Sequence, residues 1–360
     1  MNPSMVGPRL DRRQFMRLSI LTSGSLLMAA SEARPIRIAQ IGTAHSHARG
    51  KMEAIRSLRS HYEVVGIAEP DPTLESEALH DAAYQGLRWR STEELLGDPS
   101  IEVIVIETRL ADAPRFALQA IKAGKSIHLD KPGSDSHQLF RELRRRAASD
   151  DRVVQMGYML RYNPGIQLLM RAHREGWLGR ITEIDASMGK LAGEEAQRDL
   201  LGYPGHGMFE LACHLVDAVV ALLGKPDRVT SLSRRTGVSV GGLEDNQLAI
   251  LEYPTALVTL RCNHADPFGN PHRRIQVVGT RGSLLLQPLE SGRGLLQLSE
   301  ASGGFQRGDN PLALPIPTSR YAGEFLDLAE VVRSKRPLAW SADHDIAVHA
   351  TALRCAGVEP

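Results

Sequence analysis

The sequence predicts an α/β domain built on a parallel sheet, followed by an α+β domain with an open, mainly antiparallel sheet. From Pro35, short β-branched runs alternate with amphipathic helical stretches, a pattern typical of a parallel sheet. In the second half of the chain, strand-like runs follow one another without helices between them. A length of 360 residues also exceeds what a single hydrophobic core usually serves, so we expect two domains.

The first domain is expected to cover residues 34–155. A capping box at Ser91 and Glu94 starts a short helix, and Gly124 stands where the end of a helix favours a left-handed residue. A further amphipathic helix is predicted at 116–123, and another before the last strand. The predicted strands of this domain are 36–41, 63–68, 102–106, 126–129 and 153–156.

The second domain is expected at residues 156–338, and the terminal helix in 339–360 is expected to pack back on the first domain. The segment 291–317 is rich in glycine and proline and is predicted to be a loop. The helices predicted here are 164–175, 208–223, 325–332 and 345–352. The predicted strands are 229–235, 247–253, 256–263, 274–278 and 283–287, with a further one after Leu178-Gly179.

Charge and cysteine content exclude several classes of function. Lys+Arg number 43 and Asp+Glu 42, so the chain lacks the basic surface that nucleic acids or acidic membranes attract. The three cysteines, Cys213, Cys262 and Cys355, form no Cys-x-x-Cys pair and have no metal-ligand spacing. A disulfide framework is excluded in so large and cysteine-poor a chain. We therefore expect a small-molecule substrate and no nucleic-acid partner.

Residues 1–33 resemble a twin-arginine export signal. Arg12-Arg13 is followed by Phe15 and by an apolar, uncharged run over residues 18–30. The run is too short to span a bilayer comfortably, and small residues near Ala33 suit cleavage after that position. We therefore expect export by the twin-arginine machinery into the periplasm, and no membrane segment in the mature protein.

The first predicted strand runs into a glycine turn followed by a helix, which places backbone N–H groups and a positive helix end where a pyrophosphate can bind. Gly42 keeps the first glycine of the fingerprint G-x-G-x-x-G, whereas Ala44 and His47 occupy the second and third positions. Glu69 stands just past the second strand, where a carboxylate can accept hydrogen bonds from both ribose hydroxyls. Because such a carboxylate repels a 2′-phosphate, NAD is favoured over NADP.

Further along, residues 123–132 read AGKSIHLDKP and resemble the motif A-G-K-x-V-x-x-E-K-P of the glucose-fructose oxidoreductase and inositol dehydrogenase (Gfo/Idh/MocA) family. Asp130 takes the place of the usual Glu. The resemblance continues at Gly157-Tyr158, at residues 161–164 and at residues 279–283. It implies a Rossmann-type dinucleotide-binding domain and an oxidoreductase, without naming a substrate.

In this family the Lys of the E-K-P motif lies between the nicotinamide and the substrate. The resemblance therefore implies a catalytic Lys131, whose pKa desolvation is expected to lower. The segment 206–217 matches a second family motif, D-x-G-x-H-x-x-D, with Glu210 for the first Asp and His214 for the His. By this resemblance His214 accepts the proton of the substrate hydroxyl. Glu210, expected on the same helix face, orients the substrate or tunes the imidazole, and Asp217 is expected to be structural.

The chain departs from the family after the predicted strand 102–106. Where the family has T-P-N and a His three residues beyond, this chain has Thr108-Arg109-Leu110 and Ala113. Thr108 is still expected near the cofactor. The expected cofactor-binding residues are Gly42, Ala44, His45, His47, Glu69, Thr108, Asp130 and Lys131.

Together these patterns predict an NAD(P)-dependent oxidoreductase acting on a CH–OH group of a sugar or polyol. Because an exported enzyme meets no replenished pool of NAD, we expect a tightly bound cofactor. This leaves open a redox-neutral glycoside hydrolase or lyase that works through a keto intermediate.

His206, Glu210 and His214 are spaced four apart, and with His45 and His47 they leave a metal-dependent hydrolase or lyase open. A non-catalytic sugar-binding protein also stays open. The resemblance further implies a homo-oligomer formed through the open face of the antiparallel sheet.

Overall fold

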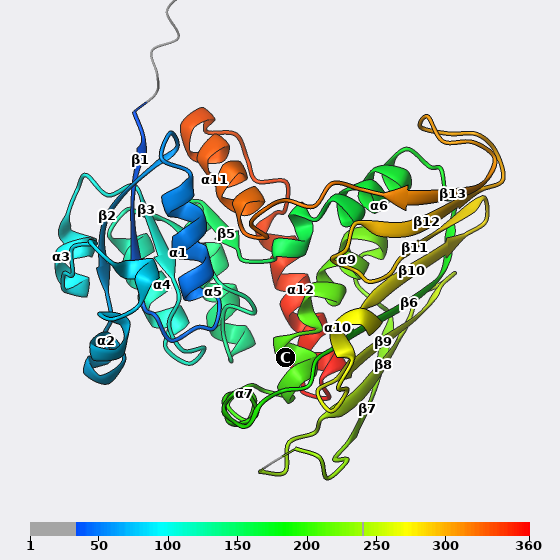
Figure 1. The fold of residues 1–360 in the computed structure, drawn as a ribbon, viewed down its shortest axis with the longest axis horizontal. Coiled ribbons are helices and arrows are strands. Elements are labelled where there is room, and N and C mark those ends of the chain that lie inside the picture. The colour runs from blue at the N-terminus through cyan, green and yellow to red at the C-terminus, as the bar shows by residue number, and fades with distance from the viewer. Residues whose placement is uncertain (1–33, 240) are drawn as a thin grey trace, which may run out of the picture. The chain divides into compact units, whose positions relative to one another are not determined.

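The computed structural model describes residues 34–239 and 241–360, so the predicted export signal lies outside the described residues. The first sheet has five parallel strands in the order β2-β1-β3-β4-β5 (Figure 1). This confirms the predicted parallel α/β part of the chain. Its strands are β1 (Ile36–Ile41), β2 (Tyr62–Ala68), β3 (Val103–Ile106), β4 (Ser126–Leu129) and β5 (Val154–Met156). The helices between them are α1 (Ala48–Ser57), α2 (Pro72–Ala78), α3 (Thr92–Gly97), α4 (Ala113–Lys122) and α5 (His137–Ser149).

The strands of this sheet are apolar because both of its faces are covered. β3 consists of four buried residues, Val103 to Ile106, as is usual for a central parallel strand. Helix α1 packs on β2, and α4 packs on β3 and β4. Since parallel strands end at the same edge, the residues that follow β1, β3 and β4 gather at one edge of the sheet.

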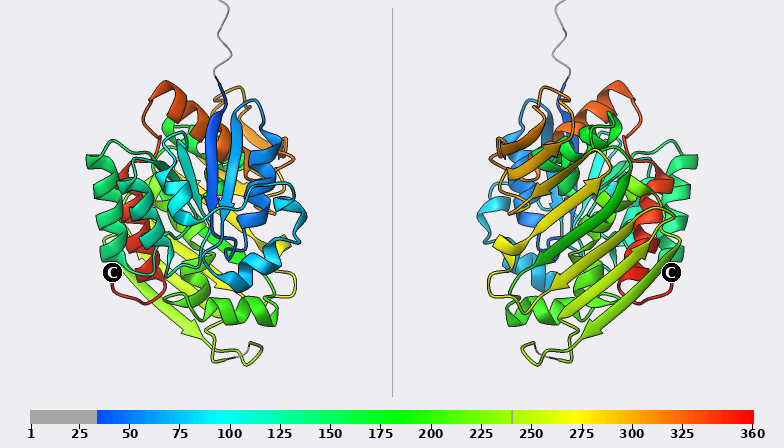
Figure 2. Two further views of the ribbon diagram at one scale, coloured as in Figure 1. Left: turned by 90° about the vertical axis from the view of Figure 1, so that its left-hand side faces the viewer. Right: turned by 90° about the vertical axis from the view of Figure 1, so that its right-hand side faces the viewer.

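The second sheet has eight strands in the order β13-β12-β11-β10-β6-β9-β8-β7, and the right-hand view of Figure 2 shows them side by side. β6 pairs with β9 in parallel, whereas the other neighbours pair antiparallel, which confirms the predicted mainly antiparallel sheet. Its strands are β6 (Ile181–Gly189), β7 (Arg228–Arg234), β8 (Asn246–Glu252), β9 (Leu257–Asn263), β10 (Arg274–Gly279), β11 (Gly282–Leu286), β12 (Arg293–Leu298) and β13 (Gly308–Ala313).

Helices pack on one face of the second sheet. Residues of β8 and β9 alternate between buried and more exposed, as expected when one face of an antiparallel sheet is covered. Helix α9 packs on β6, and α12 packs on β7 and β8 and also on α5 beside the first sheet. The helices of this part are α6 (Pro164–Arg174), α7 (Glu194–Leu200), α8 (His206–Glu210), α9 (Cys213–Leu223), α10 (Gly269–His272), α11 (Ala322–Ser334) and α12 (Ala342–Cys355).

The prediction that residues 291–317 form a loop is wrong, because β12 and β13 extend the sheet there. Gly294 is required inside β12, since a Cβ at this position would lie 2.3 Å from the Leu285 carbonyl oxygen. Pro311 is tolerated in β13 because that strand lies at the edge of the sheet, where proline costs least. The glycine and proline that indicated a loop therefore serve a close strand contact and a sheet edge.

The predicted single helix 208–223 is also wrong, because the structure divides it into α8 and α9. The amides of Leu211 and Ala212 both donate to the carbonyl of Gly207, at 2.8 and 3.3 Å, which ends the first helix. Gly207 faces His264 so closely that a Cβ on it would lie 2.1 Å from the imidazole. The apolar periodicity continues across this segment, so the sequence contains no sign of the break.

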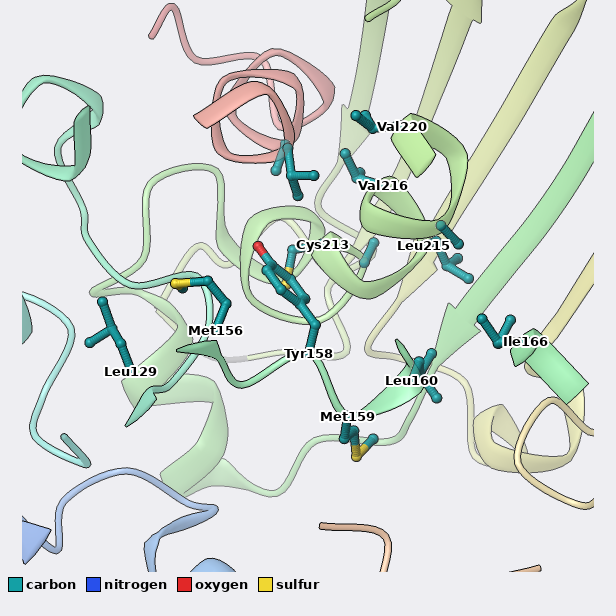
Figure 3. Close-up of a cluster of buried hydrophobic side chains, with 14 of the residues drawn as sticks. Leu129, Met156, Tyr158, Met159, Leu160, Ile166, Cys213, Leu215, Val216 and Val220 are labelled. Carbon is teal, nitrogen blue, oxygen red and sulfur yellow. The ribbon is translucent and has the colours of Figure 1, made fainter. Parts of the chain in front are cut away.

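One hydrophobic core cluster contains residues of both sheets. Figure 3 shows the part where they meet: Leu129 and Met156 end β4 and β5, Tyr158 follows them, and Cys213 and Val216 belong to α9. Each of these side chains is buried. Burial of apolar surface contributes about 25 cal/mol per Å². The two sheets therefore stabilise each other through a shared core.

Buried ion pairs tie α12 to the rest of the chain. The Arg161 guanidinium contacts Asp217 Oδ1 of α9 and Asp345 Oδ1 of α12, both at 2.7 Å. The second oxygen of Asp345 lies 2.7 Å from Arg144 of α5. Asp217, expected to be structural, belongs to this network. Three helices that are distant in sequence are thus held at one point.

Among the residues with a described structure, none of the helices has the length and apolar composition needed to cross a membrane.

Replacing Asp345 by Asn is expected to lower the free energy of unfolding by about 3 kcal/mol, because two buried guanidinium groups lose their shared carboxylate. Urea denaturation followed by circular dichroism measures the loss. The control is Arg198→Ala, which removes the exposed pair between Arg198 and Glu194 on α7 and should cost less than about 1 kcal/mol. Equal losses in the two variants would contradict a structural role for the buried network.

The stability of the fold is expected to fall with acidification through His349. Burial lowers the pKa of this imidazole to about 4, although its contact with the Ser134 carbonyl opposes the shift. Between about pH 6.5 and pH 4 the unfolded chain therefore binds a proton that the folded chain does not, and stability decreases by about 1.4 kcal/mol per pH unit. In His349→Leu the slope of unfolding free energy against pH should be smaller by this amount, and an unchanged slope would contradict the assignment.

Candidate active site

The site lies where residues after β4 meet α8 and α9. Lys131 follows β4 through Asp130, and its peptide bond to Pro132 is cis. Its ammonium donates to both the carbonyl oxygen and the Oε1 carboxylate oxygen of Glu210, each at 2.6 Å. Both side chains are buried. The two residues proposed from separate motifs thus form one ion pair between the two parts of the fold.

This pair reverses the pKa expected for Lys131. Burial alone lowers the pKa of the ammonium, but the Glu210 carboxylate outweighs burial and raises it above its usual value. For Glu210, burial favours the neutral acid, but Lys131 outweighs this and holds its pKa well below the usual range. The expectation that desolvation lowers the Lys131 pKa is therefore wrong. Lys131 is a cation that donates hydrogen bonds, rather than a neutral amine.

His214 is buried on α9, and its imidazole is neutral. Burial and then the nearby Lys131 ammonium hold its pKa well below its usual value. Its Nδ1 has no hydrogen-bond partner among the described residues. The ring lies edge-on to Tyr158, with 5.8 Å between the ring centroids. A neutral imidazole can accept a proton, although the lowered pKa makes it a weaker base than an exposed histidine and the unpartnered Nδ1 is itself buried.

Lys131, Glu210 and His214 line one cavity of about 830 Å³. Because α8 ends at Glu210 and α9 begins at Cys213, Glu210 and His214 do not share the face of a single helix. They nevertheless reach the same cavity, as does His47 from the start of α1. Polar side chains from the loops next to the second sheet and from the segment before α11 also line it: Lys190, Arg273, Glu290 and Arg320.

The glycine turn after β1 depends on Gly42. Its φ is +93°, and a Cβ there would lie 2.6 Å from the amide nitrogen of Thr108. Any other residue would push the turn away from the end of β3. Glu69 closes the turn from the other side, because its Oε2 accepts hydrogen bonds from the Thr43 amide at 2.5 Å and from the Thr43 hydroxyl at 2.8 Å.

A second cavity, of about 410 Å³, lies beside this turn and is lined by Ala44, Glu69 and Thr108. Three of the expected cofactor-binding residues thus come together. Asp71 caps α2 by accepting the Thr73 amide hydrogen and also pairs with Arg109. Residues of the segment after β1 line both cavities, Ala44 the smaller one and His47 the larger one, which fits a dinucleotide laid across the turn with its nicotinamide half toward Lys131.

The other expected cofactor residues, His45, His47 and Asp130, form a buried cluster. Asp130 Oδ2 lies 3.0 Å from the Nδ1 atom of each histidine and 2.7 Å from the Lys51 ammonium. Lys51 also contacts Glu107 at 3.0 Å. His206 is not part of this cluster. Its Nδ1 instead accepts the Glu244 amide hydrogen at 3.2 Å.

Lys51 and Glu107 were not predicted as residues of the site, although the sequence contains a signal for each of them. Lys51 falls on the apolar stripe of α1 with Ala48, Met52 and Ile55, a position where a lysine must be paired. Glu107 follows the uninterrupted apolar strand β3 and is fully buried. A lysine on a buried helix stripe and a glutamate at the end of a buried strand both need a partner of opposite charge. Each is therefore a candidate partner for the other.

The fold and the site together define a dinucleotide-dependent oxidoreductase, with a glycine turn on a parallel sheet and a lysine and imidazole in the adjoining cavity. Comparison with known proteins agrees with this class. A model described as an oxidoreductase family with an NAD-binding Rossmann fold matches residues 36–158. A model of the GFO/IDH/MocA C-terminal domain matches residues 166–285. The chain therefore belongs to the Gfo/Idh/MocA family and is an NAD(P)-dependent oxidoreductase.

Several relatives extend the similarity over most of the chain. Trans-1,2-dihydrobenzene-1,2-diol dehydrogenase of Bos taurus is 26% identical over 236 residues, covering 64% of this chain and 68% of the relative. The uncharacterized oxidoreductase YdgJ of Escherichia coli is 31% identical over 203 residues, covering 55% and 57%. A structure of levoglucosan dehydrogenase in complex with NADH and levoglucosan has the same fold, with a TM-score of 0.76 at 17% identity over 88% of this chain and 95% of the other.

Proposed function

We propose that the protein oxidises a CH–OH group of a sugar or polyol and uses NAD as hydride acceptor. The observation that carries this proposal is the placement of the charged Lys131–Glu210 pair and the neutral His214 in one cavity next to the glycine turn. These side chains supply a hydrogen-bond donor for the substrate oxygen and an acceptor for its proton. Oxidation of an alcohol requires both.

Each residue of the cavity has a distinct task in this reaction. NAD, when bound, supplies the acceptor for the hydride that leaves the carbinol carbon. Lys131 donates a hydrogen bond to the substrate oxygen and stabilises the negative charge that develops there. His214 takes the hydroxyl proton, since its imidazole is neutral at physiological pH. Glu210 keeps Lys131 charged and in place.

Glu69 supports NAD rather than NADP as the cofactor. Its carboxylate lines the cavity beside the turn together with Ala44 and Thr108. A 2′-phosphate in this cavity would meet a carboxylate, whereas ribose hydroxyls can donate hydrogen bonds to it. Arg109 lines the same cavity, but Asp71 neutralises its guanidinium at 2.9 Å.

The lining of the larger cavity supports a polyhydroxylated substrate. Lys190, Arg273 and Glu290 provide donors and acceptors opposite a few apolar side chains. The relatives that are named for their substrates, levoglucosan dehydrogenase and the dihydrodiol dehydrogenase, are consistent with a cyclic CH–OH donor. We therefore place sugars and cyclic polyols first among candidate substrates.

We further propose that the protein is exported through the twin-arginine pathway with NAD already bound, and that it forms a homo-oligomer. The pattern Arg12-Arg13 followed by Phe15 and an apolar run supports export of a folded, cofactor-loaded protein.

A cofactor that stays bound must be regenerated within each cycle. Once His214 has released the hydroxyl proton to solvent, the neutral imidazole beside a transient ketone can remove the neighbouring carbon-bound proton, so the same site supports a redox-neutral elimination or hydrolysis as the second candidate function.

A Lys131→Met, Glu210→Gln double variant removes the ion pair without leaving a buried unpaired charge. It should lower kcat by about 10³-fold for the best substrate among D-glucose, myo-inositol and levoglucosan, because the developing oxyanion loses its donor. NADH affinity, measured by fluorescence, should change little. Lys190→Met, which removes another lysine of the same cavity, should affect KM more than kcat. Full turnover by the double variant would contradict the proposed mechanism.

Bound cofactor is expected in protein purified from the exported fraction without added NAD. Denaturation followed by mass spectrometry should release close to one NAD or NADH per chain. An empty protein that binds added NAD would contradict the resident cofactor and leave an ordinary dehydrogenase. An empty protein that also fails to bind added NAD would contradict the oxidoreductase proposal itself.

A further inference from the structure

The proposed reaction leaves one cluster of chemically capable side chains without a task. His45, His47 and Asp130 each offer one donor atom, and these atoms all lie within 4.8 Å of one another. Within residues 34–239 and 241–360 this is the one group of three or more His, Cys, Asp or Glu side chains that meets this geometry. His45 and His47 belong to the segment between β1 and α1, and their side chains and that of Asp130 are largely buried.

We infer that this cluster binds a divalent transition-metal ion through the two histidine Nδ1 atoms and Asp130 Oδ2. The oxygen lies 3.0 Å from each nitrogen, a separation that two ligands of the same ion commonly show. Two imidazoles with one carboxylate form a ligand set that suits ions such as Zn²⁺, Fe²⁺ and Mn²⁺. This site goes beyond the proposed oxidoreductase function and does not depend on the identity of the substrate.

His45 contributes its Nδ1 atom to the cluster. This nitrogen lies 3.0 Å from Asp130 Oδ2 and 3.2 Å from the amide nitrogen of His47. Its single lone pair can serve either the His47 amide or a metal ion, so a bound ion would replace that hydrogen bond.

Glu107 supplies a second, independent observation. Its side chain is fully buried, and its Oε2 has no hydrogen-bond partner in the described part of the chain. This oxygen lies 3.7 Å from His45 Nδ1, too far for a hydrogen bond but directed toward the cluster. A buried carboxylate oxygen without a partner is costly, and a metal ion at the cluster would satisfy it.

The Lys51 ammonium is compatible with a bound ion, but it is also the alternative source of positive charge for the cluster. Its ammonium contacts Asp130 Oδ2 and Glu107 Oε1, so it holds both carboxylates as an outer hydrogen-bond donor does around a metal. Burial raises the pKa of Glu107 well above its usual value, so the carboxylate charge opposite the Lys51 ammonium is that of Asp130. If Lys51 alone supplied the required cation, the cluster would be a metal-free hydrogen-bond network.

The proposed ion would lie next to the large cavity, because the side chain of its ligand His47 lines that cavity together with Lys131 and His214. A metal can therefore enter from the cavity rather than through the core. The test must exclude surface histidines, and the chain offers a matched control in the exposed His272, which pairs with Asp266 at 2.7 Å.

The experiment is isothermal titration of ZnSO₄ into full-length protein that is free of a polyhistidine tag and has been treated with a chelator. We expect one Zn²⁺ per chain, and Co²⁺ bound at the same site should give visible absorption. His47→Gln and Asp130→Asn should each weaken Zn²⁺ binding by about 100-fold or more, because each removes a ligand. His272→Gln should bind Zn²⁺ as the parent does. Circular dichroism checks that every variant is folded.

Absence of stoichiometric Zn²⁺ binding by the parent protein would overturn the inference and leave Lys51 as the cation of the cluster. Binding that survives both His47→Gln and Asp130→Asn would overturn it as well, because the ion would then lie elsewhere. NADH fluorescence titration of the same samples separates this outcome from a failure of the proposed function. A protein that binds NADH but no Zn²⁺ is a dehydrogenase without the metal site.

Discussion

The contact on which the candidate active site depends is the buried ion pair between Lys131 and Glu210. Lys131 leaves the end of β4 in the first sheet, whereas Glu210 ends α8 in the second part of the chain. Neither charge could remain buried alone, since an unpaired buried ion costs several kcal/mol. The pair therefore requires the two sheets to be docked before the site exists. The shared core around Tyr158 and the Arg161 network supply that docking.

The architecture was largely predictable because its signals are local. β1, β3 and β4 are apolar runs that end in recognisable turns, and the residues that follow them had to meet at one edge of a parallel sheet. β12 and β13 were not predictable, because Gly294 and Pro311 are common in loops and only their neighbours show why a strand tolerates them. The break between α8 and α9 was not predictable either, because the amides of Leu211 and Ala212 both donate to the Gly207 carbonyl while the apolar run continues past them.

The candidate site was predictable in composition but not in electrostatics. Lys131, Glu210 and His214 followed from family motifs, and the structure brings all three to one cavity. The direction of the Lys131 pKa depends on two effects of opposite sign, burial and the Glu210 carboxylate, and a sequence does not reveal their balance. Lys51 and Glu107 each carry a sequence signal, a charge on an apolar stripe and a charge after a buried strand, but only the fold shows that they pair with each other at 3.0 Å.

Charge around the glycine turn links the cofactor to the histidine cluster. The ammonium groups of Lys51 and Lys131 face the carboxylates of Asp130 and Glu210, whereas burial raises the pKa of Glu107 well above its usual value. A pyrophosphate bound at the turn would add further negative charge close by. The N-terminus of α1 offsets part of it through its backbone N–H groups and helix dipole, but that contribution is limited to a fraction of a unit charge. A divalent ion held by His45, His47 and Asp130 would supply the remaining positive charge. The replacement of two fingerprint positions by Ala44 and His47 is then compatible with dinucleotide binding, because the turn would gain a cation where it loses the close backbone approach that glycine allows.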